Sequence, residues 1–140
     1  MCAKGNVVYM QNQVKILLDT NFLLTMVRHK IRGFEEIKEK MPGAELYTIS
    51  GVLGEIKALA GQDKKLAMEA KIVEQLLKAA KVKVLDSVLD RNVDNDMVEK
   101  AREGYVIATN DKLLRKRVHD AGGKTIFIRS LTYIETEEAD

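Results

Sequence analysis

Short apolar runs alternate with segments of helical periodicity along this chain, and this alternation restricts its fold more than any other feature. The predicted strands cover residues 14–18, 45–49, 81–85, 105–109 and 124–128. The run from Tyr105 is apolar up to Thr109, as expected for a strand that helices cover on both faces. Strands alternating with helices predict a parallel sheet with right-handed crossovers. We therefore expect an α/β fold of three layers, with a mostly parallel five-stranded sheet between helices.

The helical segments begin and end at recognisable residues. Apolar residues recur at helical spacing within 20–30, 34–41, 50–60, 63–80, 93–103 and 111–120. Asp63 is the expected N-cap of the longest helix, and Pro42-Gly43, Gly104 and Gly122-Gly123 are expected stops.

The chain has 140 residues, enough for one domain with one core, which we place at residues 14–134. Residues 1–13 form a partly ordered leader, and residues 135–140 an acidic, frayed tail, in this prediction. No apolar run is long enough to span a membrane. Cys2 is the only cysteine, which excludes a disulfide within one chain, and we expect a cytoplasmic protein. The net charge of +2 is too small to indicate a nucleic-acid partner by itself.

Four acids lie at the junctions between predicted strands and helices. Asp19 ends the first strand, and Asp111 follows the fourth. Glu55 lies in the opening turns of the helix after the second strand, and Asp94 opens the helix before the fourth. Ligands bind such sheets in the crevice outside the carboxyl ends of the strands. We therefore expect these acids to share one crevice.

Helical faces distinguish Asp94 from its neighbour Asp96. Side chains three and four residues apart share a face, which places Asp94 with Met97, Val98 and Ala101 on the core side. Asp96 shares its face with charged residues, so we expect it in solvent and keep it as a reserve ligand.

The same argument places Glu55 on the inward stripe with Val52 and Leu59. Asp19 and Asp111 also suit a purely structural role as N-caps, which stays open for each of them. Glu55 lies too deep in its helix to cap. Four carboxylates in one crevice would repel one another, and a divalent cation removes that penalty.

Carboxylates without a companion His or Cys favour a hard metal, so we expect one or two ions of Mg²⁺ or Mn²⁺. His29 and His119 have no partner at ligand spacing, which disfavours zinc. Such ions are typical of phosphoryl transfer.

The segments that carry these acids resemble the motifs of PIN-domain nucleases. Residues 16–24, with Asp-Thr-Asn after the strand, are similar to the family's first motif, and Glu55 with Ile56 and Leu59 resembles its second. Residues 93–98 resemble the third and residues 108–114 the fourth. The resemblance implies metal-dependent cleavage of single-stranded or structured RNA. It also implies that the metal ligands, which are the catalytic residues, are Asp19, Glu55, Asp94 and Asp111, and that water or ligand is oriented by Asn21, Thr109 and Asn110.

The tail, residues 126–135, is similar to the branch that contains the small-subunit processome nuclease, which implies a role in rRNA maturation and a ribosome-assembly partner. That branch often has Asp-Asp in the third motif, where this chain has Asn95 after Asp94. Toxin endonucleases of the VapC type share the same core, so a toxin ribonuclease with an antitoxin partner is an open alternative. PIN relatives often pair, which implies a homodimer.

Basic residues next to the acids are candidates for RNA binding: Lys112, Arg115, Lys116 and Arg117 in one helix, and Arg28 in another. Cations also favour solvated faces and helix C-termini, so a role without RNA stays open.

Rival functions are a non-catalytic PIN-like scaffold that binds RNA or protein, a phosphoacceptor receiver domain and a phosphatase. A receiver needs a lysine at the end of a strand, but Lys124 begins one. The phosphatase needs a second acid two residues after Asp19, where the chain has Asn21.

Overall fold

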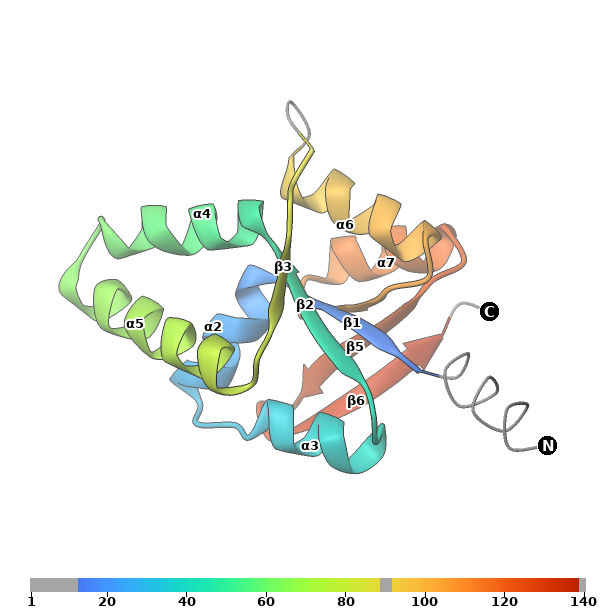
Figure 1. Ribbon diagram of the computed structural model, residues 1–140, viewed down its shortest axis with the longest axis horizontal. Helices are drawn as coiled ribbons and strands as arrows, with labels where there is room; N and C mark the ends of the chain where they lie inside the picture. Colours follow the sequence, from blue (N-terminus) through green and yellow to red (C-terminus); the bar gives the residue numbers. More distant parts are fainter. Residues whose placement is uncertain (1–12, 89–91, 139–140) are drawn as a thin grey trace.

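The computed structural model describes residues 13–88 and 92–138, and its strands form one sheet (Figure 1). The strands are β1 (Lys15–Leu18), β2 (Glu45–Ile49), β3 (Lys83–Leu85), β4 (Val106–Ala108), β5 (Lys124–Arg129) and β6 (Tyr133–Glu138). Their order is β3-β2-β1-β4-β5-β6, with the first five parallel and β6 antiparallel to β5. The predicted three-layer α/β class is confirmed, but the sheet has six strands rather than five.

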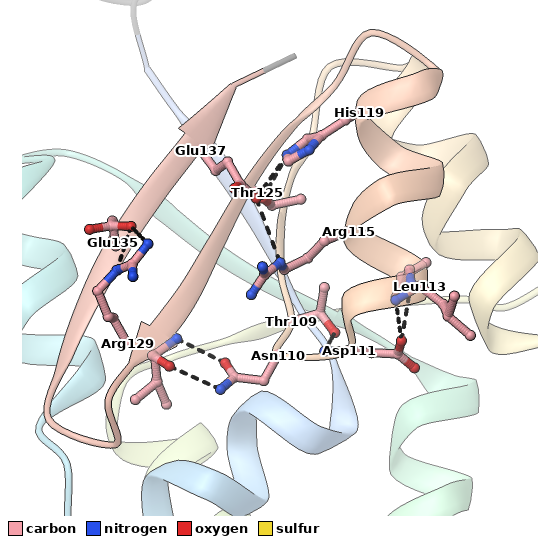
Figure 2. Close-up of polar contacts among 12 residues, drawn as sticks. Thr109, Asn110, Asp111, Leu113, Arg115, His119, Thr125, Arg129, Glu135 and Glu137 are labelled. Atoms are coloured by element: carbon pink, nitrogen blue, oxygen red, sulfur yellow. Dashed lines mark hydrogen bonds and ion pairs between the residues drawn. The ribbon is translucent and has the colours of Figure 1, made fainter. Parts of the chain in front are cut away.

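The sixth strand occupies the segment that was predicted to be a frayed acidic tail, so that expectation was wrong. Ile134 is fully buried, and its backbone N–H and C=O are bonded by Glu36 and Lys40 of the helix α3 (Gly33–Lys40). Cations on neighbouring elements pair with the glutamates of β6, as Arg129 does with Glu135 (Figure 2). Negative charges that look unfavourable in the sequence are thus offset by partners distant along the chain.

The helices cover both faces of the sheet. Besides α3, the described residues form α2 (Thr20–Arg28), α4 (Ser50–Ala60), α5 (Lys64–Ala79), α6 (Val93–Arg102) and α7 (Lys112–Asp120). α2, α4 and α5 pack together on one side, α6 and α7 lie side by side on the other, and α3 lies against β6 (Figure 1). No helix of the described segments is long and apolar enough to cross a membrane.

Local signals account for the ends of these helices. Asp63 accepts a hydrogen bond from the Leu66 N–H at 2.7 Å, which confirms its predicted role as the N-cap of α5. Gly104 and Gly122 follow α6 and α7 with φ of +102° and +85°, a conformation that glycine adopts without strain. The predicted leader, residues 1–13, lies outside the described residues apart from Gln13.

The centre of the sheet fixes where a ligand can bind. Ile16, Leu17 and Leu18 of β1 are fully buried, because helices cover both faces of that strand. β1 has β2 on one side and β4 on the other, so the strand order reverses between β1 and β4. In open parallel sheets the ligand crevice lies outside the carboxyl ends of the strands at such a reversal. The residues that follow β1 and β4 are therefore the first candidates for the site.

Candidate active site

Asp19 follows β1 at the carboxyl end of the parallel strands, where it is buried. Its N–H continues the ladder by donating to the Ala108 carbonyl at 3.0 Å, and its side chain is only 4% exposed. The hydroxyl of Thr109, the residue after β4, lies 2.8 Å from Asp19 Oδ2 and donates to it. Because Thr109 is fully buried, this bond holds the Asp19 carboxylate in one orientation.

The carboxylate of Asp19 makes no capping bond to α2, so the structural alternative of an N-cap was wrong for this residue. Burial raises the pKa of Asp19 to about 6, hydrogen bonds from Thr109 and the Thr20 backbone oppose the rise, and the charges of Asp94 and Glu55 add to it. The ionised carboxylate of Asp19 therefore lowers the stability of the folded protein, and a bound cation would offset that cost.

Asn21 joins the turn after β1 to the turn after β4. Its Oδ1 accepts a hydrogen bond from the Asn110 N–H at 2.8 Å and lies 3.2 Å from Thr109 Oγ1. Asn21 thus fixes the spacing of the two turns that carry Asp19 and Asp111, whatever else it binds.

Glu55 extends from α4 at the solvent side of the crevice. It is exposed, so the prediction of an inward side chain was wrong; it lies at the margin of the stripe that buries Val52 and Ile56. Glu55 Oε1 accepts a hydrogen bond from Thr20 Oγ1 at 2.5 Å. Thr20 was not among the predicted site residues, although its position directly after Asp19 in the first motif was a usable signal.

Asp94 and Asp96 lie in the first turn of α6 but face different surroundings. Burial raises the pKa of Asp94, the charge of Asp111 raises it further, and the charge of Arg117 lowers it. Asp96 is 1% exposed, and its Oδ2 accepts from the Val88 N–H at 3.3 Å. The prediction of a solvated Asp96 was wrong because the segment after β3 covers that side of the helix. Its carboxylate faces that segment's backbone.

Asp111 caps α7, as the structural alternative proposed. Its Oδ1 accepts hydrogen bonds from the N–H groups of Leu113 at 2.9 Å and Leu114 at 3.1 Å (Figure 2). The cap uses only one of the two carboxylate oxygens. Asp111 can therefore cap the helix and present Oδ2 to a ligand at the same time.

Asn110 makes structural contacts with β5, and the ligand-orienting role that the resemblance implied stays a prediction. Its Oδ1 accepts from the Ile128 N–H at 2.8 Å, and its Nδ2 donates to the Ile128 carbonyl at 3.1 Å (Figure 2). Both ends of the amide bind the backbone of β5. The side chain thus holds the turn after β4 against its neighbouring strand.

Close contacts join the start of α4 to Ser87 and to the first residue of α6. The Gly51 N–H donates to Ser87 Oγ at 2.6 Å, and the Ser87 N–H donates to Ser50 Oγ at 2.9 Å. A Cβ at Gly51 would lie 2.8 Å from Ser87 Oγ and 3.0 Å from Val93 Cγ2. The first turn of α6 reaches the first turn of α4 because no side chain occupies that position.

Arg28 was predicted to bind RNA, but the structure gives it another partner. Its Nε donates to both carboxylate oxygens of Glu69 at 3.0 Å, and Glu69 is 7% exposed. This ion pair joins α2 to α5. A buried carboxylate needs such a partner, so Arg28 is part of the packing between these helices.

Two of the basic residues of α7 are likewise engaged. Arg115 lies over the Phe127 ring, 3.9 Å from its centroid. Its Nε is 3.6 Å from Glu137 (Figure 2). Lys116 pairs with Asp120 at 3.0 Å, one turn along the same helix. Lys112 and Arg117 form no ion pair with the described residues.

The four predicted acids form a continuous electrostatic chain. The charges of Glu55 and Asp94 raise the pKa of Asp19, and the charge of Asp111 raises the pKa of Asp94. None of the four forms a salt bridge with a lysine or arginine of residues 13–88 and 92–138. No three ligating side chains of these residues are already gathered around one point. The donor set is all oxygen and has no salt-bridge partner among these residues, which fits a hard divalent cation.

The fold and this acidic crevice agree with a comparison of the sequence with known families. The model of the PIN-like domain matches residues 16–131. The chain therefore belongs to the PIN-like family of nucleases.

Individual relatives extend over nearly the whole chain. Ribonuclease VapC4 of Methanocaldococcus jannaschii is 28% identical, and the match covers 86% of this chain and 95% of that protein. The structure of the PIN domain endonuclease Utp24 has a TM-score of 0.72 at 21% identity, covering 91% of this chain and 93% of its own. A domain of a functionally unknown protein from M. jannaschii has a TM-score of 0.59 at 16% identity, covering 91% and 96%. The two structural likenesses establish the fold.

Proposed function

We propose that this chain is a metal-dependent endoribonuclease that hydrolyses phosphodiesters of single-stranded or structured RNA. The main support is the repulsion among Asp19, Glu55, Asp94 and Asp111, none of which forms a salt bridge with a lysine or arginine of the described residues. Such repulsion lowers folding stability, so its presence at the ligand-binding end of the sheet favours a functional role. Membership of a nuclease family and the similarity to a named ribonuclease support the same reaction.

The four acids are the proposed ligands of one or two ions of Mg²⁺ or Mn²⁺. When bound, such ions activate a water and stabilise the charge that grows on the phosphate oxygens. Thr109 orients the carboxylate of Asp19, and Thr20 orients that of Glu55. Asn21 fixes the distance between the two turns of the crevice. These neutral groups place the ligands without reducing their charge.

RNA is the proposed substrate, and the resemblances of the sequence suggest two cellular settings. An rRNA-maturation enzyme would have a ribosome-assembly partner, whereas a toxin ribonuclease of the VapC type would have an antitoxin. A homodimer and a cytoplasmic location remain predictions. Mapping new RNA 5′ ends after controlled expression distinguishes the settings, because maturation cuts fall in precursor rRNA and toxin cuts in other RNAs of growth-arrested cells.

A cleavage assay tests the proposed reaction. Purified protein is incubated with single-stranded RNA with Mn²⁺, with Mg²⁺ or with EDTA, and Asp19→Asn serves as the control for contaminating nucleases. We expect cleavage only by the wild type and only with metal. Titration calorimetry measures metal binding in parallel. A protein that binds RNA but neither binds these ions nor cleaves would be a non-catalytic scaffold, which would refute the proposed reaction.

A further inference from the structure

Arg117 spans the gap between α7 and the first turn of α6. Its Nη2 donates to Asn95 Oδ1 at 2.7 Å, and Asn95 is the residue next to Asp94. This bond places the positive charge of Arg117 beside the turn of α6 that carries Asp94. The side chain is otherwise exposed.

The partner of Arg117 is neutral, which separates it from neighbouring cations. Arg115 and Lys116 of the same helix each pair with a carboxylate. Among the residues that the structure describes, Arg117 forms no ion pair, and its one side-chain hydrogen bond is to the amide of Asn95. A guanidinium has five N–H donors in a planar fork. The tether therefore fixes the position of the group while leaving its charge and most of its donors available.

We propose that Arg117, held in place by Asn95, binds a backbone phosphate of the RNA next to the acidic chain. This inference rests on the proposed function, because it concerns how that site receives its substrate. RNA brings negative charge to a crevice lined by four acids, and a fixed cation at its rim offsets the repulsion. A guanidinium fits two phosphate oxygens at once, which orients the strand as well as attracting it.

The role also gives a physical reason for the neutral residue at position 95. An aspartate there would pair with Arg117, and the guanidinium would no longer have a full charge to offer to a phosphate. It would also add a fifth negative charge to the crevice. An asparagine keeps the hydrogen bond and avoids both effects. Asn95 is thus a positioning residue, and Arg117 is the group that contacts RNA.

Binding is measured without cleavage, using the full chain with Asp19→Asn in EDTA and a fluorescein-labelled single-stranded RNA. We expect Arg117→Gln to weaken binding roughly tenfold, the loss of one charge-assisted hydrogen bond. The slope of log affinity against log salt should fall by about one, because one phosphate contact is lost. The RNA affinity of Arg117→Lys should lie between those of the parent protein and Arg117→Gln. Arg102→Gln is the matched control, because Arg102 is exposed near the far end of α6 and pairs with Glu99.

The role of Asn95 is tested by a pair of charge-matched variants. Asn95→Asp should weaken binding several-fold, whereas Asn92→Asp, which adds the same charge at the N-cap of the same helix, should change it by less than about twofold. If Asn95 acts through Arg117, adding Asn95→Asp to Arg117→Gln should cause little further loss. Full additivity of the two losses would refute the positioning role.

The outcome separates this inference from the proposed reaction. Binding that depends on Arg117 in a protein that never cleaves RNA would support the phosphate contact and refute the nuclease activity. Metal-dependent cleavage with equal RNA binding by Arg117→Gln and Arg102→Gln would refute the contact alone. Undetectable RNA binding by the parent protein would also refute it. In the cleavage assay, loss of Arg117 should raise KM far more than it lowers kcat.

Discussion

Replacing Asp19 with asparagine should stabilise the metal-free protein, although it removes a proposed metal ligand. The pKa of Asp19 is raised from its ordinary value of 3.8 to about 6. One pKa unit corresponds to about 1.4 kcal/mol, so the ionised carboxylate lowers the free energy of unfolding by about 3 kcal/mol. An asparagine is neutral, and its amide oxygen can still accept the hydrogen bond of Thr109.

The expected gain in stability depends on pH, because the folded and unfolded chains release the Asp19 proton at different pH values. The unfolded chain releases this proton near pH 3.8, whereas the folded protein retains it up to about pH 6. Folding therefore takes up a proton between these values, and the contribution of Asp19 to stability is lost as the pH rises through this window. We expect the variant to be about 1–3 kcal/mol more stable than the wild type at about pH 8, with no difference below about pH 4.

Urea denaturation in EDTA, followed by circular dichroism across this range, measures the effect. The melting temperature at the higher pH should rise by roughly 3–10 °C. Asp63→Asn is the control, because Asp63 is exposed and asparagine caps a helix equally well. A gain for Asp19→Asn that persists unchanged in acid, or no gain at neutral pH, would contradict the reasoning. Adding Mn²⁺ should reverse the order, because ligand binding stabilises only the protein that binds it.

Three further changes have defined outcomes. Asp94→Asn should abolish metal-dependent RNA cleavage while leaving metal-free stability unchanged or raised, since it removes a repulsive charge; normal cleavage would show that Asp94 is not a ligand. Arg28→Leu should lower the free energy of unfolding by about 1–3 kcal/mol, because Glu69 is left buried and unpaired, and should leave binding of the fluorescein-labelled RNA unchanged. Asn110→Ala should lower the free energy of unfolding by about 1–3 kcal/mol, because both hydrogen bonds to Ile128 are lost. Urea denaturation measures this effect, and an unchanged midpoint would argue against the proposed anchor.

The parallel part of the fold could be predicted because its signals are local. The residues of β2 are those of the predicted strand, and Asp63 and Gly104 lie at the ends of α5 and α6 as expected. The strand β6 could not be predicted, because its glutamates are stabilised by cations on β5 and α7. No periodicity within residues 133–138 reports those distant partners.

The candidate site was likewise predictable only in part. Asp19 and Asp111 follow strands, so the sheet rule alone placed them at one crevice. The surroundings of Asp96 depend on the segment after β3, which folds over the outer side of α6. Helical periodicity distinguishes the faces of one helix but does not reveal which neighbouring segment covers each face. The tether between Asn95 and Arg117 likewise depends on how α6 and α7 pack.

The strand β6 also disfavours association between the sheets of two molecules, because it covers the edge of β5. A chain shortened at Ile134 would lose most of this strand and leave the backbone of β5 unpaired along a run whose apolar side chains are buried. Exposed strand edges of that kind template aggregation, whereas charged outer strands discourage it. The glutamates of β6 thus make the edge of the sheet unfavourable for pairing with a strand of another molecule. Proteolytic trimming at this end is expected to reduce solubility before it affects the candidate active site.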